Sequence, residues 1–341
     1  MASVKKHINI PIFIPHLGCP NDCVFCNQRS ISGKTHFDPD SVRIEIEEAL
    51  STVKEGTEAE IAFFGGSFTG IDRGLMIYLL DIAQSYVDAG KISAIRLSTR
   101  PDYISDEILN ILKGYAVRTV ELGIQSTNDG VLTECKRGHL AKASESACAL
   151  VKKYGFELIG QMMVGLPGAT VKTEIKTAED ICRMGADGAR VYPTVVFYET
   201  ELCEMSKRGE YAPLTLDDAV YRTKEVLKVF AEREVPCIRV GLCASENLSS
   251  EDSVYGGANH SAIGELAVGE IFFEKMDEAL EERSRVETLP QKPVIYVPVG
   301  CTSKAVGQKR KNILRLCRKY LIRDVKILEK NTIIGYNILL S

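Results

Sequence analysis

The sequence lacks the features that would place the protein in a membrane or outside the cell. No apolar run approaches the ~20 residues that span a bilayer. The apolar stretch "INIPIFI" at 8–14 is too short for the core and cleavage site of a signal peptide. The net charge is only −4 over 341 residues, so the charge as a whole does not point to nucleic acid. We therefore expect a cytoplasmic protein with no membrane partner, whose thiols are mostly reduced.

Short apolar runs alternate with longer amphipathic stretches through the first 200 residues. The expected strands are 8–14, 60–64, 93–98, 117–124, 156–164 and 188–196, and the expected helices are 39–55, 73–89, 105–113, 139–154 and 170–184. Such alternation predicts βαβ units around a parallel sheet. Six units favour an α/β fold, a partial (β/α)6 barrel of the TIM type. A complete barrel and a doubly wound open sheet are the alternatives.

Beyond residue 200 this alternation becomes looser. The expected elements are a helix at 215–234, a strand at 236–241, a loop at 243–259, a helix at 261–284, a strand at 292–298, a helix at 304–321 and a hairpin at 324–339. We therefore expect a core barrel at 1–211 and an α+β extension at 212–341.

The chain has eleven cysteines, and three of them fall within eight residues of "HLGCPNDCVFCNQ" (16–28). Cys19, Cys23 and Cys26 follow the first expected strand, and "PND" between the first two favours a turn. Loops after the strands of a β/α barrel build its active site. In a reducing compartment, such a group indicates metal binding or redox chemistry.

Three thiolates leave one coordination position that the protein does not fill. Structural zinc usually has four protein ligands, and iron–sulfur cubanes usually have four cysteines. With three cysteines, one iron of a cubane stays open to a substrate. A zinc ion with His16 as fourth ligand and three unrelated core cysteines are the alternative interpretations. We expect most of the other eight cysteines to be buried apolar residues.

The Cx3Cx2C spacing after a first strand resembles the motif of the radical S-adenosylmethionine (SAM) superfamily. The resemblance implies that Cys19, Cys23 and Cys26 bind a 4Fe–4S cluster whose open iron takes the amino and carboxylate groups of SAM. It also implies a 5′-deoxyadenosyl radical that abstracts hydrogen from the substrate, and a low-potential electron donor of the flavodoxin or ferredoxin type. Phe25 matches the aromatic residue before the third cysteine and is expected near the adenine.

Glycine-rich and polar motifs follow the later strands. "FFGGSFTG" (63–70) resembles the glycine-rich motif that binds the SAM amino group, with Gly65, Gly66 and Ser67 at the matching positions. "STRPDY", "ELGIQS", "KRGH" and "GQMMVGLPG" contain the other candidates. By the resemblance, the residues that contact the carboxylate, ribose or adenine of SAM are Arg100, Gln125, Arg137 and Gln161. Each motif also has an ordinary structural interpretation. The Gly-Gly motif can be a plain turn, and Arg100 can belong to a surface ion pair. Gln125 can be a hydrogen-bonded loop amide, and Arg137 can be a cation that caps a helix.

Taken in order over residues 8–211, these motifs are similar to the catalytic subunit of the Elongator complex. The similarity implies that the substrate is RNA, most specifically tRNA. Two features depart from that family: the spacing before the second cysteine is shorter, and Gln161 stands where the family has His. The remaining ~130 residues are too few for an acetyltransferase domain beside the other elements. We therefore do not expect this chain alone to carboxymethylate wobble uridine, and its last third resembles the extension of bacterial Elongator-like radical SAM proteins.

Two other functions are compatible with these motifs. Oxygen-independent coproporphyrinogen oxidases share a looser form of the pattern, which implies a tetrapyrrole or another small molecule as substrate. A non-catalytic protein that binds RNA or senses a signal through its cluster is the other alternative.

The C-terminal extension contains a strongly basic segment. Residues 301–323 carry eight Lys and Arg and no acid, so the rest of the chain carries −12, that is −4 less +8. On a single helix at 304–321, five basic residues share one face: Lys304, Lys311, Arg315, Arg318 and Lys319. A basic stripe of this kind predicts contacts with RNA phosphates. A solvated or ion-paired helix face is the alternative.

Overall fold

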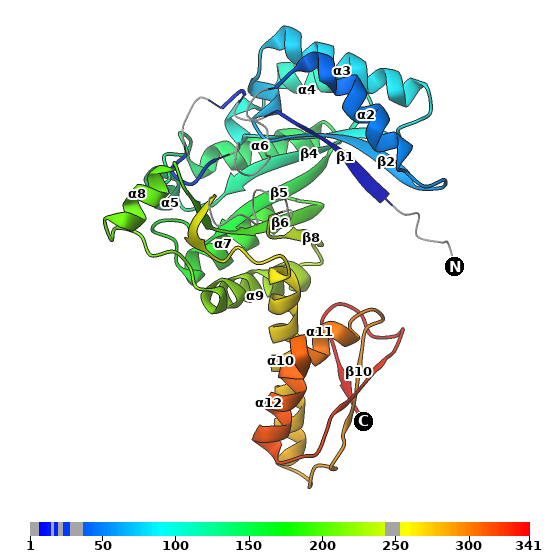
Figure 1. Ribbon diagram of the computed structural model, residues 1–341, viewed down its shortest axis with the longest axis vertical. Coiled ribbons are helices and arrows are strands. Elements are labelled where there is room, and N and C mark those ends of the chain that lie inside the picture. The colour runs from blue at the N-terminus through cyan, green and yellow to red at the C-terminus, as the bar shows by residue number, and fades with distance from the viewer. Residues whose placement is uncertain (1–6, 15–16, 20–22, 28–36, 243–252) are drawn as a thin grey trace.

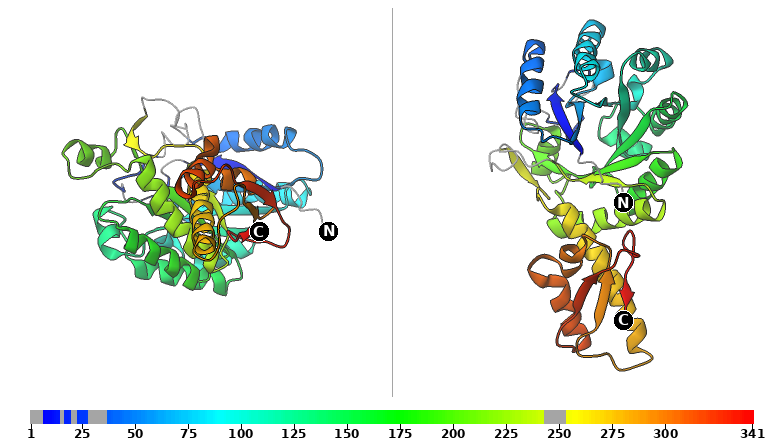
Figure 2. Two further views of the ribbon diagram at one scale, coloured as in Figure 1. Left: turned by 90° about the horizontal axis from the view of Figure 1, so that it is seen from below. Right: turned by 90° about the vertical axis from the view of Figure 1, so that its right-hand side faces the viewer.

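The computed structural model describes residues 7–14, 17–19, 23–27, 37–242 and 253–341. Within these residues, seven parallel strands form one sheet in the order β1–β2–β3–β4–β5–β6–β8. The sheet is curled (Figure 2). The strands are β1 (His7–Phe13), β2 (Glu58–Phe64), β3 (Ala94–Thr99), β4 (Val117–Gln125), β5 (Glu157–Val164), β6 (Gly188–Pro193) and β8 (Cys237–Val240). A doubly wound sheet reverses its strand order part-way, and this sheet does not. The expected partial barrel is therefore confirmed, with β8 as a seventh strand.

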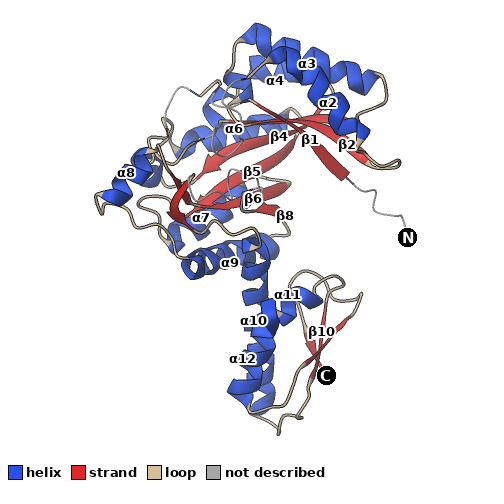
Figure 3. Ribbon diagram, in the orientation of Figure 1, coloured by secondary structure: helices blue, strands red, loops and turns tan. Residues whose placement is uncertain are grey.

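Helices connect the strands and cover the outer face of the sheet (Figures 1 and 3). The five helices expected before residue 185 are confirmed with small shifts at their ends. They are α2 (Val42–Ser51), preceded by the 3-10 helix Pro39–Ser41, α3 (Arg73–Asp88), α4 (Asp106–Lys113), α6 (Ala141–Lys153) and α7 (Val171–Arg183). The expected α9 (Leu216–Glu232) follows, and two short helices, α5 (Asp129–Glu134) and α8 (Glu201–Lys207), were not expected. No helix among the described residues is both long and apolar enough to cross a bilayer.

Polar side chains fix the starts of several of these helices. At α3, the carboxylate of Asp72 accepts a hydrogen bond from the amide of Leu75 at 3.0 Å. At α4, the hydroxyl of Ser105 accepts one from the amide of Ile108 at 3.3 Å. A capping box built on Thr170 starts α7. Each cap satisfies an amide that has no partner inside the helix, so the local sequence itself determines where the helix begins.

The two faces of the sheet differ in chemistry. Ile61, Phe63 and Leu97 pack under the helices in the main apolar core. Glu60 and Arg96, at alternate positions of the same strands, instead line a cavity on the inner side. This follows from the two-residue period of a strand, in which successive side chains point to opposite faces. The curled sheet therefore separates an apolar outer core from a polar interior.

The expected strand at 188–196 is divided in the structure. β6 ends early, and β7 (Val195–Phe197) pairs antiparallel with β9 (Val254–Gly257) in a separate two-stranded sheet. The expected loop at 243–259 is therefore wrong where β9 forms a strand, and residues 243–252 lie outside the described part of the chain.

A second unit follows the sheet along the chain. Its long helix, α10 (Ile263–Ser284), leads away from the sheet (Figure 1). The other elements are β10 (Val294–Val297), α11 (Thr302–Val306), the 3-10 helix Gln308–Arg310, α12 (Lys311–Tyr320), β11 (Lys326–Glu329) and β12 (Leu339–Leu340). On α10, Ile271 clusters with Leu227 of α9, whereas Phe272 and Met276 belong to a core within the second unit. The division at residue 211 stays a prediction, although β8, which follows it in the chain, joins the first sheet.

Two expectations for this second unit are wrong. β11 and β12 do not form a hairpin with each other: both pair with β10, β11 in parallel and β12 in antiparallel orientation. The basic segment is not one helix either, because α11 and α12 are separated at Gly307, whose φ is 75°. Lys309 and Arg310 also have positive φ, so the chain changes direction there. Lys304 therefore lies on α11 and does not share a continuous helix face with the basic residues of α12.

Candidate active site

The cysteine loop lies beyond the end of β1 and is attached to two other segments. The amide of Cys26 donates a hydrogen bond to the carbonyl of Cys23 at 2.9 Å, which closes a turn. Val24, inside this turn, is buried: its amide donates to the carbonyl of Cys135 at 3.2 Å, and its carbonyl accepts from the amide of Leu202 at 2.8 Å. These bonds fix the second and third cysteines against the end of α5 and the start of α8.

Glycines bring the loop after β2 against the cysteine loop. The amide of Ser67 donates to the carbonyl of Leu17 at 3.0 Å. A Cβ atom on Gly66 would lie 2.2 Å from the oxygen of Leu17, and one on Gly18 would lie 2.3 Å from the oxygen of Ser67. Neither position can hold a side chain, so these glycines make room for backbone. Contact of Gly65, Gly66 and Ser67 with SAM stays a prediction.

Two buried arginines meet beside Cys23. Arg100 is 3% exposed and Arg137 is 6% exposed. Nη1 of Arg137 donates to Sγ of Cys23 at 3.4 Å, and Nη1 of Arg100 lies 4.0 Å from the same sulfur. Nη2 of Arg100 donates to the carbonyl of Arg137 at 2.5 Å and to Asp102 at 2.7 Å. The structure thus gathers two predicted contacts of SAM at one predicted cluster ligand.

The charges at this site act on the nearby thiols and carboxylate. Burial raises the pKa of Cys19, while the guanidinium groups of Arg137 and Arg100 act in the opposite direction. Burial also raises the pKa of Cys135, to about 12, so this neighbouring thiol stays neutral. For Asp102, burial acts to raise the pKa, but the hydrogen bonds and charge of Arg100 outweigh it and hold the pKa below its usual value.

Gln125 ends β4 in an unusual backbone conformation. Its φ is 65°, a left-handed value that residues other than glycine rarely adopt. The pairing of β4 with β5 shifts register between Gly123 and Gln125. Nε2 of Gln161 donates to Oε1 of Gln125 at 3.4 Å, and Nη2 of Arg137 donates to the carbonyl of Gly123 at 2.6 Å. The end of β4 therefore brings Gln125, Gln161 and Arg137 to one region.

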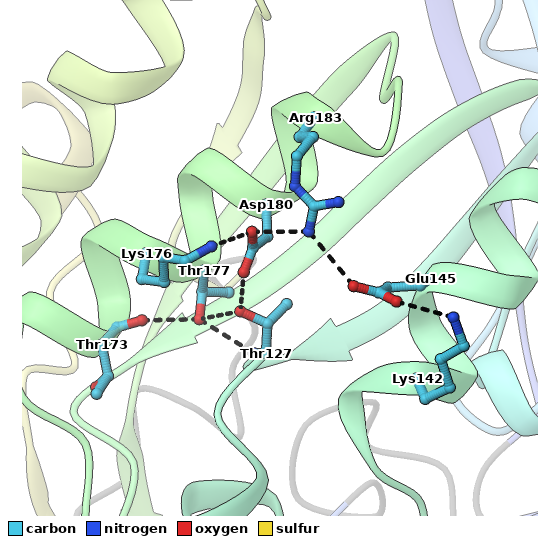
Figure 4. Close-up of polar contacts among 8 residues, drawn as sticks. All are labelled: Thr127, Lys142, Glu145, Thr173, Lys176, Thr177, Asp180 and Arg183. Atoms are coloured by element: carbon cyan, nitrogen blue, oxygen red, sulfur yellow. Dashed lines mark hydrogen bonds and ion pairs between the residues drawn. The ribbon is translucent and has the colours of Figure 1, made fainter.

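A polar network attaches the backbone just after Gln125 to α7 (Figure 4). The amide and hydroxyl of Thr127 lie 3.1 and 3.3 Å from Oγ1 of Thr177, and the hydroxyl donates to Asp180 at 2.8 Å. Asp180 is also paired with Lys176 on the same helix. The network holds the segment that follows the strained residue, so tertiary contacts maintain its conformation.

The groups around Cys23 fit an iron–sulfur cluster with an anion beside it. Nε of Arg137 is buried and has no hydrogen-bond partner among the described residues, so it can take a carboxylate. In the same described residues, no three Cys, His, Asp or Glu side chains converge as the ligands of a single ion do. A cubane does not require such convergence, because each thiolate binds a different iron. The groups beside Cys23 are therefore compatible with a cubane, and the zinc alternative depends on His16, which lies outside the described residues.

Comparison with known proteins decides the family. The model of the Radical SAM superfamily matches residues 13–181, and the model of the Radical_SAM C-terminal domain matches residues 186–271. An uncharacterized protein of Methanocaldococcus jannaschii is 30% identical over 233 residues, which are 64% of this chain and 69% of that protein. The chain belongs to the radical SAM superfamily. As a radical SAM enzyme, it uses a 4Fe–4S cluster and SAM.

Two further relatives confirm the expected similarity to the Elongator catalytic subunit. The tRNA uridine(34) acetyltransferase of Methanocaldococcus infernus is 30% identical over 217 residues, 58% of this chain and 39% of that protein. The chain thus spans about two fifths of this relative. The structure of M. infernus Elp3 lacking residues 1–46 has a TM-score of 0.59 and 22% identity, and it covers 83% of this chain and 64% of its own. This structural likeness shows the shared fold.

Phe25 lies in an apolar cluster of this radical SAM enzyme. It packs with Val24, Leu166 and Met163, which come from the cysteine loop, the loop after β5 and β5 itself. The position of Phe25 beside the adenine stays a prediction.

The predicted RNA contacts lie in the second unit, and most of them have acidic partners. Lys311 and Arg315 pair with Glu270 at 3.2 and 2.7 Å, and Lys319 pairs with Asp277 at 2.7 Å. Both carboxylates belong to α10. These ion pairs neutralise part of the positive charge, as expected if the basic residues form an ion-paired helix face instead of an RNA contact. RNA binding by Lys304, Lys311, Arg315, Arg318 and Lys319 stays a prediction.

Sequence reasoning missed several residues that build the site. Asp102 holds Arg100 through two hydrogen bonds, of 2.9 and 2.7 Å, and its position two residues after that arginine was the available signal. Gly18 and Gly70 join the cysteine loop to the loop after β2, since a Cβ on Gly70 would lie 2.5 Å from the oxygen of Gly18. Their role depends on a contact between two loops about fifty residues apart, which single-sequence patterns do not contain.

Proposed function

We propose that this radical SAM enzyme modifies a nucleotide of RNA, most specifically of tRNA, by hydrogen abstraction. The observation that supports the radical chemistry of this proposal most directly is the group of Cys23, Arg100 and Arg137 beyond the carboxyl ends of the strands. In this proposal Cys19, Cys23 and Cys26 hold the cluster. When bound, the cluster and SAM supply the electron transfer and the hydrogen abstraction, and a flavodoxin- or ferredoxin-type protein provides the electron.

The residues of the chain bind and orient the cofactor in this proposal. Arg137 offers a buried donor, Nε, to the carboxylate of SAM, and its Nη1 stabilises the Cys23 thiolate. Asp102 holds Arg100 in place beside it. The adjoining amides of Gln125 and Gln161 supply donors and acceptors for the ribose or adenine.

Two observations support RNA as the substrate. A relative that is 30% identical carries the name tRNA uridine(34) acetyltransferase. In addition, Lys304 and Arg318 take part in none of the ion pairs that the basic segment forms among the described residues, so their charge is available to phosphates.

Mass spectrometry of tRNA nucleosides tests this proposal. We expect one modified nucleoside to disappear when the gene is deleted, to return with the wild-type protein, and to stay absent with Cys23→Ala. An unchanged set of nucleosides would contradict RNA as the substrate. A tetrapyrrole bound to the purified protein would then favour the coproporphyrinogen oxidase-like function, and a cluster that leaves SAM intact would favour sensing.

A further inference from the structure

A polar cavity lies at the opposite end of the curled sheet from the cysteines. Its volume is about 490 Å³, and residues near the amino ends of the strands line it, among them Asn9, Glu60, Arg96 and Arg239. Arg96 and Arg100 are four residues apart along one strand and its continuation, which corresponds to about 13 Å. None of the predicted cluster ligands or SAM contacts is among the residues that line the cavity, so its lining is distinct from that of the proposed SAM site. Its volume suits a small molecule of roughly mononucleotide size.

The carboxylates around this cavity already have donors. Oε1 of Glu60 accepts a hydrogen bond from Nη1 of Arg118 at 2.8 Å, and Oε2 of Glu60 lies 3.3 Å from Nε2 of His7. Oε2 of Glu157 accepts one from the hydroxyl of Thr119 at 2.8 Å, and Asp187, the third carboxylate that lines the cavity, is paired with Lys152 at 2.6 Å. The acidic side chains are thus partly compensated, and they do not exclude a further anion.

One nitrogen of the Arg96 guanidinium group has no hydrogen-bond acceptor among the described residues. The residue is 7% exposed, and Nη1 donates to Oδ1 of Asn9 at 3.3 Å. Its Nε lies 3.9 Å from Glu60, beyond hydrogen-bond distance, and has no hydrogen-bond partner within the described residues. A buried guanidinium nitrogen without a partner is costly unless a ligand or water satisfies it.

Besides Arg118 of β4, which donates to Glu60, two more guanidinium groups line the same cavity from other strands. Arg190 of β6 contacts two side chains. Its Nε lies 3.0 Å from Oε2 of Glu121, and its Cζ lies 5.2 Å from the centroid of the Phe64 ring. Nε of Arg239, on β8, donates to the carbonyl of Gly241 at 3.0 Å. β3, β6 and β8 therefore each present one arginine to a single cavity.

We propose that this cavity binds the oxyanion, phosphate or carboxylate, of a small ligand, with Arg96 as the main contact. A guanidinium group matches either anion with two parallel hydrogen bonds, and the rigid strands fix these groups in advance. This site goes beyond the proposed function and does not depend on it, because the cavity can hold a small anion whether or not RNA is the substrate.

Isothermal titration of the anaerobic, cluster-containing full chain tests the site. The probes are inorganic phosphate, succinate, uridine 5′-monophosphate and uridine, with S-adenosylhomocysteine present to fill the SAM site. We expect at least one of the three anions to bind and uridine not to bind. Tighter binding of the nucleotide than of phosphate would assign the anion to a nucleotide, and preference for succinate would assign it to a carboxylate.

Variants locate the binding. Arg96→Gln should weaken the anion about tenfold or more, since hydrogen bonds to charged groups contribute strongly. Arg43→Gln, an exposed arginine on α2, should leave binding unchanged. If Arg96→Gln does not fold, as judged by circular dichroism, Arg239→Gln at the same cavity decides, with an expected loss of about threefold to tenfold. The proposal is overturned if no anion binds, or if binding survives unchanged in the folded cavity variants.

Discussion

At the scale of single residues, Arg137 is buried and forms no ion pair with a carboxylate of the described residues. In the described part of the chain, its side chain donates only to the sulfur of Cys23 and the carbonyl of Gly123, and its Nε donates to nothing. A buried cation usually has an acidic partner, because leaving water is costly. The missing negative charge is what a thiolate-bound cluster and the SAM carboxylate would supply.

The first prediction concerns this guanidinium. Arg137→Met keeps much of the volume and removes the charge, so it should weaken SAM binding about tenfold or more. Equilibrium dialysis with labelled SAM measures the effect, and iron content shows whether the cluster is retained. Arg208→Met, at an exposed position paired with Glu210, is the matched control. Equal SAM affinity in the three proteins would exclude Arg137 from the binding site.

The second prediction is a pH dependence at Asp102. The pKa of its carboxyl is held below the usual value by Arg100, so the ionised form stabilises the fold above the unfolded pKa of about 3.9 and loses this effect as the pH falls through the folded pKa. Wild type should therefore be more stable than Asp102→Asn at pH 7, and the difference should shrink below about pH 4. Urea unfolding across pH measures it. Asp217→Asn, which changes an exposed carboxylate on α9, is the control. A stability difference between wild type and Asp102→Asn that grows as the pH falls would contradict the argument.

At the scale of elements, the site depends on two loops that fit against each other. The cysteine loop after β1 and the glycine loop after β2 approach so closely that Gly66 and Gly18 leave no space for a Cβ. The strands place the two loops side by side, and the glycines set the distance between them. Retention of the cluster should therefore depend on residues that never touch iron.

The third prediction tests this loop contact. Gly66→Ala places a methyl group 2.2 Å from the carbonyl oxygen of Leu17, so the cysteine loop must move. We expect reconstituted iron per chain to fall at least about twofold while the helical circular dichroism signal is kept, since the change lies outside the apolar core. Gly74→Ala, in the first turn of α3, brings its methyl group near only one side-chain oxygen of Asp72, at 3.1 Å, and no backbone atom of the cysteine loop, so it serves as the control. Full iron content in Gly66→Ala would refute the loop argument.

The fourth prediction concerns α10 and α12. Glu270 neutralises Lys311 and Arg315, so Glu270→Gln frees positive charge on α12. If this face contacts RNA, tRNA affinity should rise and its dependence on salt should steepen by about one to two phosphate contacts. Stability should change by less than about 1 kcal/mol, because such ion pairs are partly solvated. Arg318→Gln should have the opposite effect on affinity. If the Glu270→Gln variant binds tRNA with the same affinity as wild type, the basic face of α12 does not contact RNA.

Local patterns predicted the elements well and their distant partners poorly. The apolar runs at 117–124 and 156–164 correctly predicted β4 and β5, because a strand that is buried on both faces consists largely of apolar residues. The basic segment was misread as one helix, since charge periodicity does not reveal the positive φ of Gly307. The pairing of α12 with α10 was missed because Glu270 lies 45 residues from Arg315 in the sequence.

At the scale of the whole molecule, one curled sheet carries two chemically distinct ends. The carboxyl ends of the strands lead to the three cysteines, Arg100 and Arg137, and the amino ends surround the cavity that contains Arg96. Motifs at the first end were visible in the sequence, because they are contiguous with each strand end. The cavity was not, because its arginines come from strands spread over more than 140 residues of sequence and meet only when the sheet curls.

Anaerobic SAM cleavage by the purified full chain tests the central claim most directly. With dithionite as reductant, we expect wild type to contain iron and sulfide and to release 5′-deoxyadenosine. Cys19→Ala, Cys23→Ala and Cys26→Ala should each abolish the release, whereas Cys148→Ala, at a buried cysteine of the outer core, should retain it. Zinc in place of iron, or undiminished 5′-deoxyadenosine from the three cysteine variants, would contradict the account.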